Sequence, residues 1–315
     1  MKVGSLFSGI GGIDLGFILA GHKIAWANDI DSFACKTYRH NFPDTFLYEQ
    51  DIRTLDANLL DDIDILVAGF PCQPFSVMGY KRGFKDNRGN LFFEIARIAE
   101  AKRPPIIFLE NVKNLMNHDC GKTFLIIYNT LVELGYMVKY EVVNATDFDI
   151  PQNRARIFIV AFLDYETCNS FKFPDAKRST KTIEDILDRT KQHSDVYYYT
   201  EKYKHFAELT RKVKGKSGIY RIDDSGIANK KYMVCPTLKA NMGTYPHRVT
   251  IIRDAFGVRQ LTPRECLDFQ GFPHWFNFKG IPLNEAYKQA GNTVCVPVIE
   301  GIAEKICTGR VMDKI

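Results

Sequence analysis

The sequence has no apolar run close to the ~18 residues that a membrane-spanning helix needs. An apolar stretch follows Lys2, as in a secretion signal, but Asp14 and four glycines interrupt it. None of the eight cysteines forms a C-x-x-C pair, which argues against a structural zinc site. Scattered cysteines of this kind are typical of reduced intracellular proteins. We therefore expect a cytoplasmic protein with no membrane partner and no bound metal.

Internal repeats and low-complexity tracts are also missing, and the net charge is only +5. The charge is unevenly distributed, however. Residues 177–259 contain 18 Lys and Arg against 9 Asp and Glu, so this segment carries +9 and the rest of the chain −4. A basic segment in a slightly acidic chain indicates a polyanion partner, although a solvated surface rich in loops would give the same pattern.

The 315 residues are enough for two domains, or for one large domain with an insertion. Apolar runs bounded by turn residues alternate with helical patterns along the first part of the chain. Strands are expected at residues 3–7, 23–27, 63–68, 106–109 and 156–162, and helices at 13–20, 33–40, 91–101 and 124–134. This order predicts an α/β fold with a doubly wound, mostly parallel sheet.

The pattern changes near Pro174. From there to about Leu283 the expected strands are short and irregularly spaced, with many Lys, Tyr, Gly and Asn residues. An apolar, helix-like pattern then returns at residues 287–305. We therefore predict one domain formed by residues 1–173 together with 284–315, and a second, smaller domain at 174–283.

A glycine-rich turn follows the first expected strand, at residues 7–12. Glycines let a ligand approach the backbone closely, although this G-x-G-G is not the full G-x-G-x-x-G dinucleotide fingerprint. Asp29 ends the second expected strand, where an acid can accept hydrogen bonds from ribose hydroxyls. Asp51 is expected to end a third strand, where it could bind an adenine amino group. Together these features predict an adenosine-containing cofactor, either a nicotinamide dinucleotide or S-adenosylmethionine.

Three further groups are candidates for chemistry. Cys72 lies between Pro71 and Pro74, after the strand at 63–68, where ligands bind in open α/β sheets. Glu110 directly follows a buried strand, where burial raises a carboxyl pKa. Arg154 and Arg156 are expected to point the same way from one strand. Each has an ordinary alternative: an inert buried thiol for Cys72, a helix N-cap or surface acid for Glu110, and an edge-strand salt bridge for the two arginines.

The motifs resemble, in order, those of the cytosine-5 DNA methyltransferases, particularly the compact bacterial enzymes of restriction–modification systems. The matching segments are residues 7–12, 71–73, 110–112, 152–156, 264–266, 270–273 and 291–294. They extend over nearly the whole chain. Several independent motifs in one order are far more specific than any one of them.

The resemblance implies a Rossmann-like, S-adenosylmethionine-dependent methyltransferase sheet and a mainly β target recognition domain at 174–283. The enzyme would transfer a methyl group from S-adenosyl-L-methionine to carbon 5 of a flipped-out cytosine, leaving S-adenosyl-L-homocysteine. Cys72 would be the nucleophile that forms a covalent adduct. Glu110 would hold the N3 edge of the cytosine, and Arg156 its O2, with Arg154 beside them.

The resemblance also assigns a cofactor pocket, with two departures from the usual family pattern. Many relatives have Glu where this chain has Asp29, which keeps the acceptor, and an aromatic residue where it has Ile30, which loses stacking. The implied cofactor residues are Phe7, Ser8, Gly9, Gly11, Gly12, Asp29, Ile30, Asp51, Ile52, Pro71, Leu91, Asn292 and Thr293.

The basic segment would then contact duplex DNA. Lysines and arginines mostly meet phosphates, and fewer of them read base edges. Thr237 and Leu238 resemble a Thr-Leu pair common in this family. The candidate DNA contacts are Gln73, Ser76, Arg211, Lys212, Lys214, Lys216, Thr237, Leu238, Asn241, His247 and Arg248.

Three alternatives can be weighed against this interpretation. An RNA-methylating branch of the same family would need less duplex readout than the large basic segment offers. An NAD-dependent oxidoreductase would need a pyrophosphate turn and a hydride site, which the sequence does not contain. A non-catalytic relative would be expected to lose Cys72 or Glu110. We expect a monomer that acts on double-stranded DNA, with a restriction endonuclease in the same system but no direct contact with it.

Overall fold

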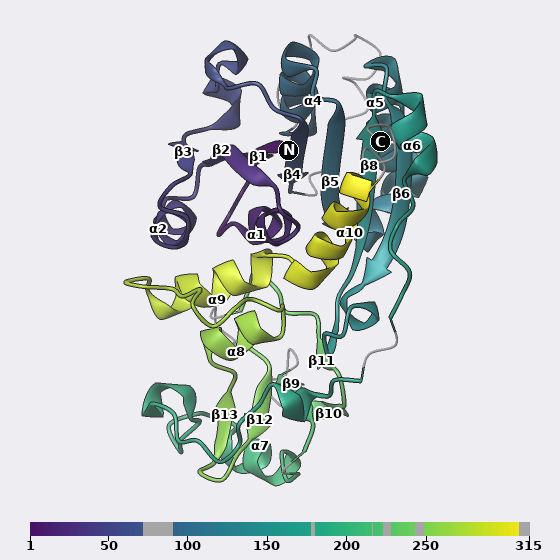
Figure 1. Ribbon diagram of the computed structural model, residues 1–315. Coiled ribbons are helices and arrows are strands. Elements are labelled where there is room, and N and C mark those ends of the chain that lie inside the picture. Colours follow the sequence, from purple (N-terminus) through teal and green to yellow (C-terminus); the bar gives the residue numbers. More distant parts are fainter. Residues whose placement is uncertain (72–90, 178–179, 216, 223–227, 243–248, 309–315) are drawn as a thin grey trace. The chain divides into compact units, whose positions relative to one another are not determined.

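A computed structural model describes residues 1–71, 91–177, 180–215, 217–222, 228–242 and 249–308 (Figure 1). Its internal contacts divide the chain into two compact units. Unit 1 consists of Met1–Val143, Ala155–Asp175 and Val298–Ile315, and unit 2 of Asn144–Arg154 and Ala176–Pro297. These units are defined by packing, so the functional division at 173/174 and 283/284 stays a prediction.

Unit 1 is built on a seven-stranded sheet in the order β3-β2-β1-β4-β5-β8-β6 (Figure 1). Neighbouring strands from β3 to β5 are parallel, whereas β8 runs antiparallel to β5. The strands are β1 (Lys2–Leu6), β2 (Lys23–Asp29), β3 (Phe46–Glu49), β4 (Ile65–Gly69), β5 (Ile106–Val112), β6 (Met137–Asn144) and β8 (Ala155–Phe162).

Helices cover both faces of this sheet. Alternate residues of β5 point to opposite faces, so Leu109 and Phe108 pack against helices on different faces of the sheet. Leu109 belongs to the core cluster that includes buried residues of α4 (Leu91–Lys102) and α5 (Lys122–Glu133). Phe108 instead contacts Phe17 of α1 (Gly12–Leu19), with ring centroids 5.3 Å apart. Gly16 of α1 packs so closely on Ile299 of α10 (Val296–Thr308) that a Cβ there would overlap it.

The remaining helices of unit 1 are short. They are α2 (Ser32–Asn41), α6 (Tyr165–Ser170) and the 3-10 turns η1 (Ile52–Thr54), η2 (Ala57–Leu59), η4 (Lys113–Met116) and η5 (His118–Gly121). Asp31 caps α2, because its carboxylate accepts hydrogen bonds from the N–H groups of Phe33 and Ala34.

The predicted α/β class and doubly wound sheet are confirmed, and each predicted strand and helix of unit 1 is present with its ends shifted slightly. Within this sheet, one strand end was wrong and one strand was missed. β5 does not stop before Glu110 but continues through it to Val112. β6 was not predicted, because most of its residues are half-buried or exposed and give no continuous apolar run. Along the described parts of the chain, no helix is long and apolar enough to cross a membrane.

Unit 2 contains a four-stranded antiparallel sheet in the order β10-β9-β12-β13 and a separate parallel pair, β11-β7. The strands are β7 (Gln152–Asn153), β9 (Ile219–Ile222), β10 (Ala228–Tyr232), β11 (Cys235–Pro236), β12 (Ile251–Arg253) and β13 (Val258–Gln260). The helices are α7 (Phe206–Lys212), α8 (Pro263–Asp268), α9 (Leu283–Asn292), η6 (Ala145–Asp147), η7 (Ile183–Asp185) and η8 (Asp195–Tyr197). This is the smaller, irregular structure with an antiparallel sheet of its own that the sequence predicts, although its helices contain more residues than its strands.

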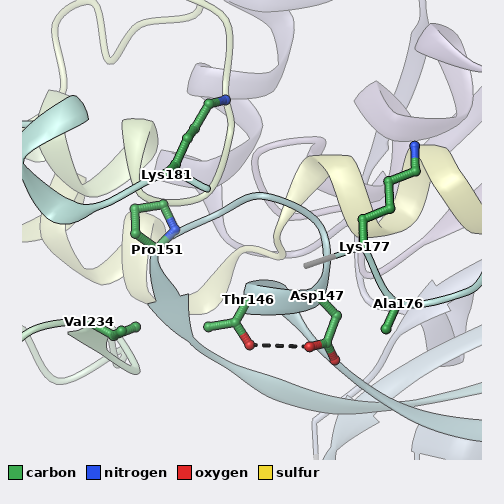
Figure 2. A pocket seen from close by; sticks show the side chains of 7 residues that line it. All are labelled: Thr146, Asp147, Pro151, Ala176, Lys177, Lys181 and Val234. Atoms are coloured by element: carbon green, nitrogen blue, oxygen red, sulfur yellow. Dashed lines mark hydrogen bonds between the residues drawn. The ribbon is translucent and has the colours of Figure 1, made fainter. Parts of the chain in front are cut away.

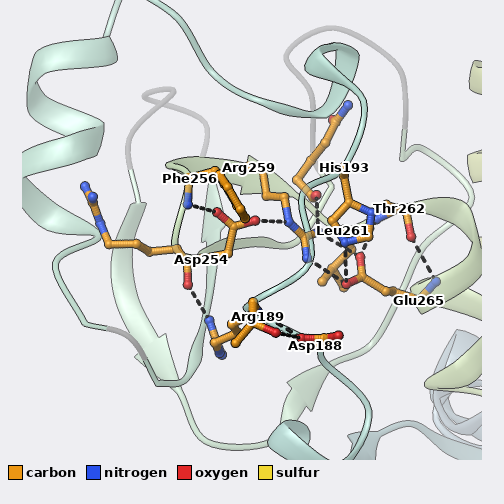
Figure 3. Close-up of polar contacts among 12 residues, drawn as sticks. Asp188, Arg189, His193, Asp254, Phe256, Arg259, Leu261, Thr262 and Glu265 are labelled. Atoms are coloured by element: carbon orange, nitrogen blue, oxygen red, sulfur yellow. Dashed lines mark hydrogen bonds and ion pairs between the residues drawn. The ribbon is translucent and has the colours of Figure 1, made fainter.

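A buried ion network joins β13 of unit 2 to α8 (Figure 3). The side chain of Arg259 is fully buried and donates to Asp254 Oδ2 at 2.6 Å and to both oxygens of Glu265 at 2.8 Å. Glu265 also forms a capping box with Thr262 at the start of α8. The hydroxyl of Tyr198 donates to Asp254 at 2.9 Å. Each buried charge therefore has opposite charges or polar hydrogens as partners, as burial requires.

Candidate active site

The turn between β1 and α1 has the open backbone that the glycine motif predicts. Phe7, Gly9 and Gly11 all have positive φ angles, of 54°, 55° and 87°. A Cβ on Gly11 would overlap the ring of Phe42, so both its conformation and its packing require glycine. A Cβ on Gly9 would meet nothing within 4 Å, which leaves this side of the turn accessible to a ligand. Ser8 is buried and bonds to the Asn28 carbonyl, and Gly12 begins α1.

Asp29, the last residue of β2, lies beside this turn. Its Oδ2 accepts the N–H of Gly9 at 2.7 Å, and its Oδ1 accepts the N–H of Asp31 at 2.8 Å. Burial raises the pKa of Asp29, and the two N–H groups oppose that shift. An ionised carboxylate has about four acceptor sites, so the group can still accept a hydrogen bond from a ligand hydroxyl. Ile30 follows with 64% of its surface exposed, an apolar side chain next to a polar group.

Asp51 lies two residues beyond β3 rather than at its end, and caps η1. The side chain of Arg53 binds both of its oxygens, with Nε at 3.0 Å from each, and lowers the pKa of Asp51. A ligand amino group would share this carboxylate with Arg53. The next residue, Ile52, is buried in the core of unit 1. Leu91 is the first residue of α4 and is half-buried.

Glu110 and Arg156 form an ion pair on adjacent antiparallel strands. Nε of Arg156 lies 3.1 Å from Oε1 of Glu110, and both side chains are largely buried. In the sheet register Glu110 is opposite Gly69, the last residue of β4. A Cβ on Gly69 would lie 3.6 Å from Glu110 Oε2, so the carboxylate is adjacent to that strand end. The chain then continues from Gly69 through Phe70 to Pro71, which is exposed.

Asn111 is a further residue of this site, and sequence reasoning had assigned it no role. Its Nδ2 donates to the carbonyl of Phe70 at 2.9 Å, and its Oδ1 accepts the N–H of Val112 at 2.8 Å. Asn111 is buried, and a buried amide in an apolar strand needs such partners. A polar amide within an apolar strand was therefore the sequence feature that could have identified Asn111. The side chain fixes the backbone immediately before Pro71.

Cys72, the predicted nucleophile, and Gln73 and Ser76 lie outside the described residues. Several described cysteines can be assessed as alternatives. Burial raises the pKa of Cys35 to about 12 and also raises the pKa of Cys168, Cys235 and Cys266. These four thiols therefore stay protonated at neutral pH, which makes them poor nucleophiles.

Arg154 and Arg156 do not share a strand face as expected. Arg154 precedes β8, in unit 2, whereas Arg156 lies within β8, in unit 1. The strand alternation that predicted a common direction therefore does not apply to Arg154. Its guanidinium donates to the carbonyls of Leu238 at 2.8 Å, Gly291 at 3.3 Å and Thr293. Asn292 and Thr293 are the last residue of α9 and its C-cap, also in unit 2.

The candidate DNA contacts that the structure describes all lie in unit 2. Arg211 and Lys212 end α7 and pair with Glu208, at 3.8 Å and 3.0 Å, whereas Lys214 is exposed. The hydroxyl of Thr237 donates to the carbonyl of Asn153 at 2.6 Å. The side chain of Leu238 is buried, and Asn241 is half-buried. The other candidates, Lys216, His247 and Arg248, lie outside the described residues.

One cavity of about 440 Å³ lies within unit 2, and none of its lining residues is among the predicted site residues (Figure 2). Its lining includes Lys177 and Lys181 together with Asp147, and Lys181 pairs with Asp149 at 3.4 Å. Asp147 is the one acid beside the two lysines in this lining, and the other lining residues are uncharged, so the cavity has no strong charge that would define a ligand.

Comparison with known proteins gives a consistent result. The family profile for C-5 cytosine-specific DNA methylases matches residues 1–308. The chain is 46% identical over 310 residues to Type II methyltransferase M.Bsp6I of Bacillus sp. (strain RFL6), covering 97% of this chain and 98% of that relative. It is 40% identical to Type II methyltransferase M.NgoBI of Neisseria gonorrhoeae, covering 98% and 93%. A DNMT2 variant from Spodoptera frugiperda shares the fold, with a TM-score of 0.74 at 22% identity over 97% of this chain and 99% of that one.

Proposed function

The chain belongs to the family of C-5 cytosine-specific DNA methylases, and we propose that it methylates a cytosine within a specific duplex DNA sequence, using S-adenosyl-L-methionine. The observation that carries the proposal is the Glu110–Arg156 pair. A carboxylate and a guanidinium are held together beside the end of β4, the strand that leads into the Pro71–Cys72 segment. The two side chains match the family motifs at 110–112 and 152–156.

In this proposal the residues act on a base removed from the stack, because stacked cytosine cannot reach them. Carbon 5 of cytosine is a poor nucleophile. The Cys72 thiolate adds to carbon 6 and makes carbon 5 electron-rich, which is covalent catalysis. Once carbon 5 carries the methyl group, loss of its proton breaks the carbon 6–sulfur bond and restores the thiolate. Glu110 holds the N3 edge and favours protonation of N3 as the thiolate adds. Arg156 binds O2 and also holds the Glu110 carboxylate in place, as the 3.1 Å pair supports.

The residues around the β1–α1 turn fit an adenosine-type methyl donor. When bound, S-adenosyl-L-methionine supplies an electrophilic methyl group on its sulfonium. Asp29 would accept hydrogen bonds from the ribose, and Ile30 would cover the adenine with its exposed apolar surface. The open side of Gly9 would admit the ligand close to the backbone. Asp51 would bind the adenine amino group, sharing its carboxylate with Arg53.

The Type II relatives support a role in restriction–modification, in which methylation protects host DNA from a partner endonuclease. The enzyme would act in the cytoplasm as a monomer, without binding the endonuclease.

Expression in a host that lacks cytosine methylation tests the function. Bisulfite sequencing of the host DNA should find one short sequence word fully protected with the wild-type chain. The Cys72→Ser variant should leave that word unprotected, because serine does not supply a thiolate. Transfer RNA from the same cells is the comparison sample. Modified transfer RNA with unmodified DNA, or full protection by Cys72→Ser, would contradict the proposal.

A further inference from the structure

The Thr-Leu pair at 237–238 is docked on the Gln-Asn-Arg segment at 152–154, although more than eighty residues separate them in the sequence. β11 pairs in parallel with β7, so that Cys235 is opposite Gln152 and Pro236 opposite Asn153. The Thr237 hydroxyl then donates to the Asn153 carbonyl. The parallel pair is only two residues long, so side chains must hold the segment beyond it.

Leu238 is held at both of its backbone groups. Its N–H donates to Oε1 of Gln152 at 3.3 Å, and its carbonyl accepts from Nη1 of Arg154 at 2.8 Å. Gln152 is fully buried, and Arg154 and Leu238 are 3% and 1% exposed. The two side chains therefore fix the orientation of the peptide units on both sides of Leu238. Buried hydrogen bonds of this kind are costly to break, particularly when the donor is charged.

The same two side chains also bind the ends of two helices. Nη2 of Arg154 donates to the carbonyls of Gly291 and Thr293 at the end of α9, where carbonyls lack helical partners and the helix dipole favours a cation. Nε2 of Gln152 donates to the carbonyl of Phe269, the C-cap of α8, at 2.7 Å. A Cβ on Gly291 would overlap the Lys239 carbonyl, so α9 packs directly on the residue after Leu238.

We propose that Gln152 and Arg154 are positioning residues that hold the Thr237–Leu238 turn and the end of α9 in one fixed arrangement. The inference rests on the proposed function, in which the turn contacts DNA. It assigns Arg154 to the ordering of the DNA-contacting segment, whereas the resemblance placed it beside the reacting base. Loss of either side chain should then weaken DNA binding more than it slows the chemical step.

Two variants remove these contacts. Arg154→Lys keeps the charge but cannot reach three carbonyls with one forked group. Gln152→Met has a similar volume and loses both hydrogen bonds. Arg264→Lys is the matched control, because Arg264 also donates to backbone carbonyls in unit 2, those of Phe272, Pro273 and Phe276. Among the described residues, Arg264 forms no hydrogen bond or ion pair with residues 237–239.

Hydrogen exchange followed by mass spectrometry measures directly how well the backbone amides of residues 235–241 are protected. Both test variants should increase exchange there about tenfold, whereas Arg264→Lys should leave it within about twofold of wild type. In methylation assays both should raise KM for DNA about tenfold, and Gln152→Met should do so with kcat nearly unchanged, because it loses binding and not transition-state contacts.

Wild-type exchange in residues 235–241 of either test variant would overturn the inference, as would a fall in kcat at unchanged KM for DNA. The exchange measurement needs no activity. If the wild-type chain methylated no DNA, the proposed function would fail while the exchange result still decided whether the two side chains order this segment. If Arg154→Lys did not fold, Gln152→Met would give the same decision.

Discussion

Asp29 connects the glycine turn to the end of β2, and its carboxylate is the acceptor best placed for a ribose. Replacing it with alanine should weaken S-adenosylmethionine binding by about 1–3 kcal/mol, since hydrogen-bonding groups would lose their partner. Titration calorimetry measures this change. Asp31→Ala is the control, because Asp31 caps α2 and should cost about 1 kcal/mol of folding stability without changing cofactor affinity. Equal affinities for wild type and Asp29→Ala would remove Asp29 from the pocket.

Asp14 is a second acid near the turn, but it is completely buried beneath it. Its carboxylate accepts hydrogen bonds from the hydroxyls of Ser5 and Tyr38, both at 2.5 Å. Burial raises the pKa of Asp14 to about 6, although the two hydroxyls oppose the shift. A raised folded-state pKa means that the folded form binds the proton more tightly than the unfolded form. Its contribution to stability is therefore complete below pH ~4 and is lost as the pH rises to about 6.

The Asp14→Asn variant, whose side chain cannot ionise, tests this pH dependence. Its free energy of unfolding, relative to wild type, should increase by up to about 3 kcal/mol between pH 4 and pH 7, because only the wild type loses the contribution of the protonated acid. Urea denaturation at several pH values measures it. A constant difference between the two proteins across this range would show that Asp14 does not titrate there.

At the scale of elements, local patterns predicted most of unit 1. β4 is a continuous apolar run, and the turn before α1 is marked by its glycines, so both could be found from neighbouring residues alone. β6 could not, because it mixes exposed and half-buried residues. The partners of Arg154 lie 84 to 139 residues away, and only the folded chain brings them together. Sequence spacing therefore located the motif but did not identify the residues that Arg154 contacts.

The ion network between β13 and α8 leads to a prediction about unit 2. Arg259→Met would leave Asp254 and Glu265 buried without their cation, which should lower the free energy of unfolding by about 3–5 kcal/mol. Arg211→Met removes an exposed pair in the same unit and should cost at most about 1 kcal/mol. Denaturation curves for the two variants give the comparison. Similar small losses in both would mean that the buried network contributes no more than a surface ion pair.

For the whole molecule, the basic segment and the packing units do not have the same limits. The predicted recognition domain at 174–283 packs in unit 2 with residues 144–154 and 284–297 from both flanks. Gln152, Arg154 and Gly291 lie in those flanks and hold residues 237–239. A segment that determines sequence preference can therefore be exchanged only if its Thr-Leu turn still packs against Gln152, Arg154 and Gly291.

A chimera tests whether residues 174–283 select the DNA sequence while the rest of the chain carries out the methyl transfer. Residues 174–283 are replaced by the corresponding segment of a relative that methylates a different, known sequence and that keeps the Thr-Leu pair. We expect the chimera to methylate the donor's sequence, because residues 177–259 carry +9 while the rest of the chain carries −4, which indicates that this segment meets the DNA. Contacts to bases determine the sequence, whereas contacts to phosphates only position the protein. Bisulfite sequencing of the host DNA identifies the methylated word, and the reciprocal chimera is the control. An active chimera that still methylates the original word would show that the segment is a solvated basic surface and that the sequence is read elsewhere in the chain.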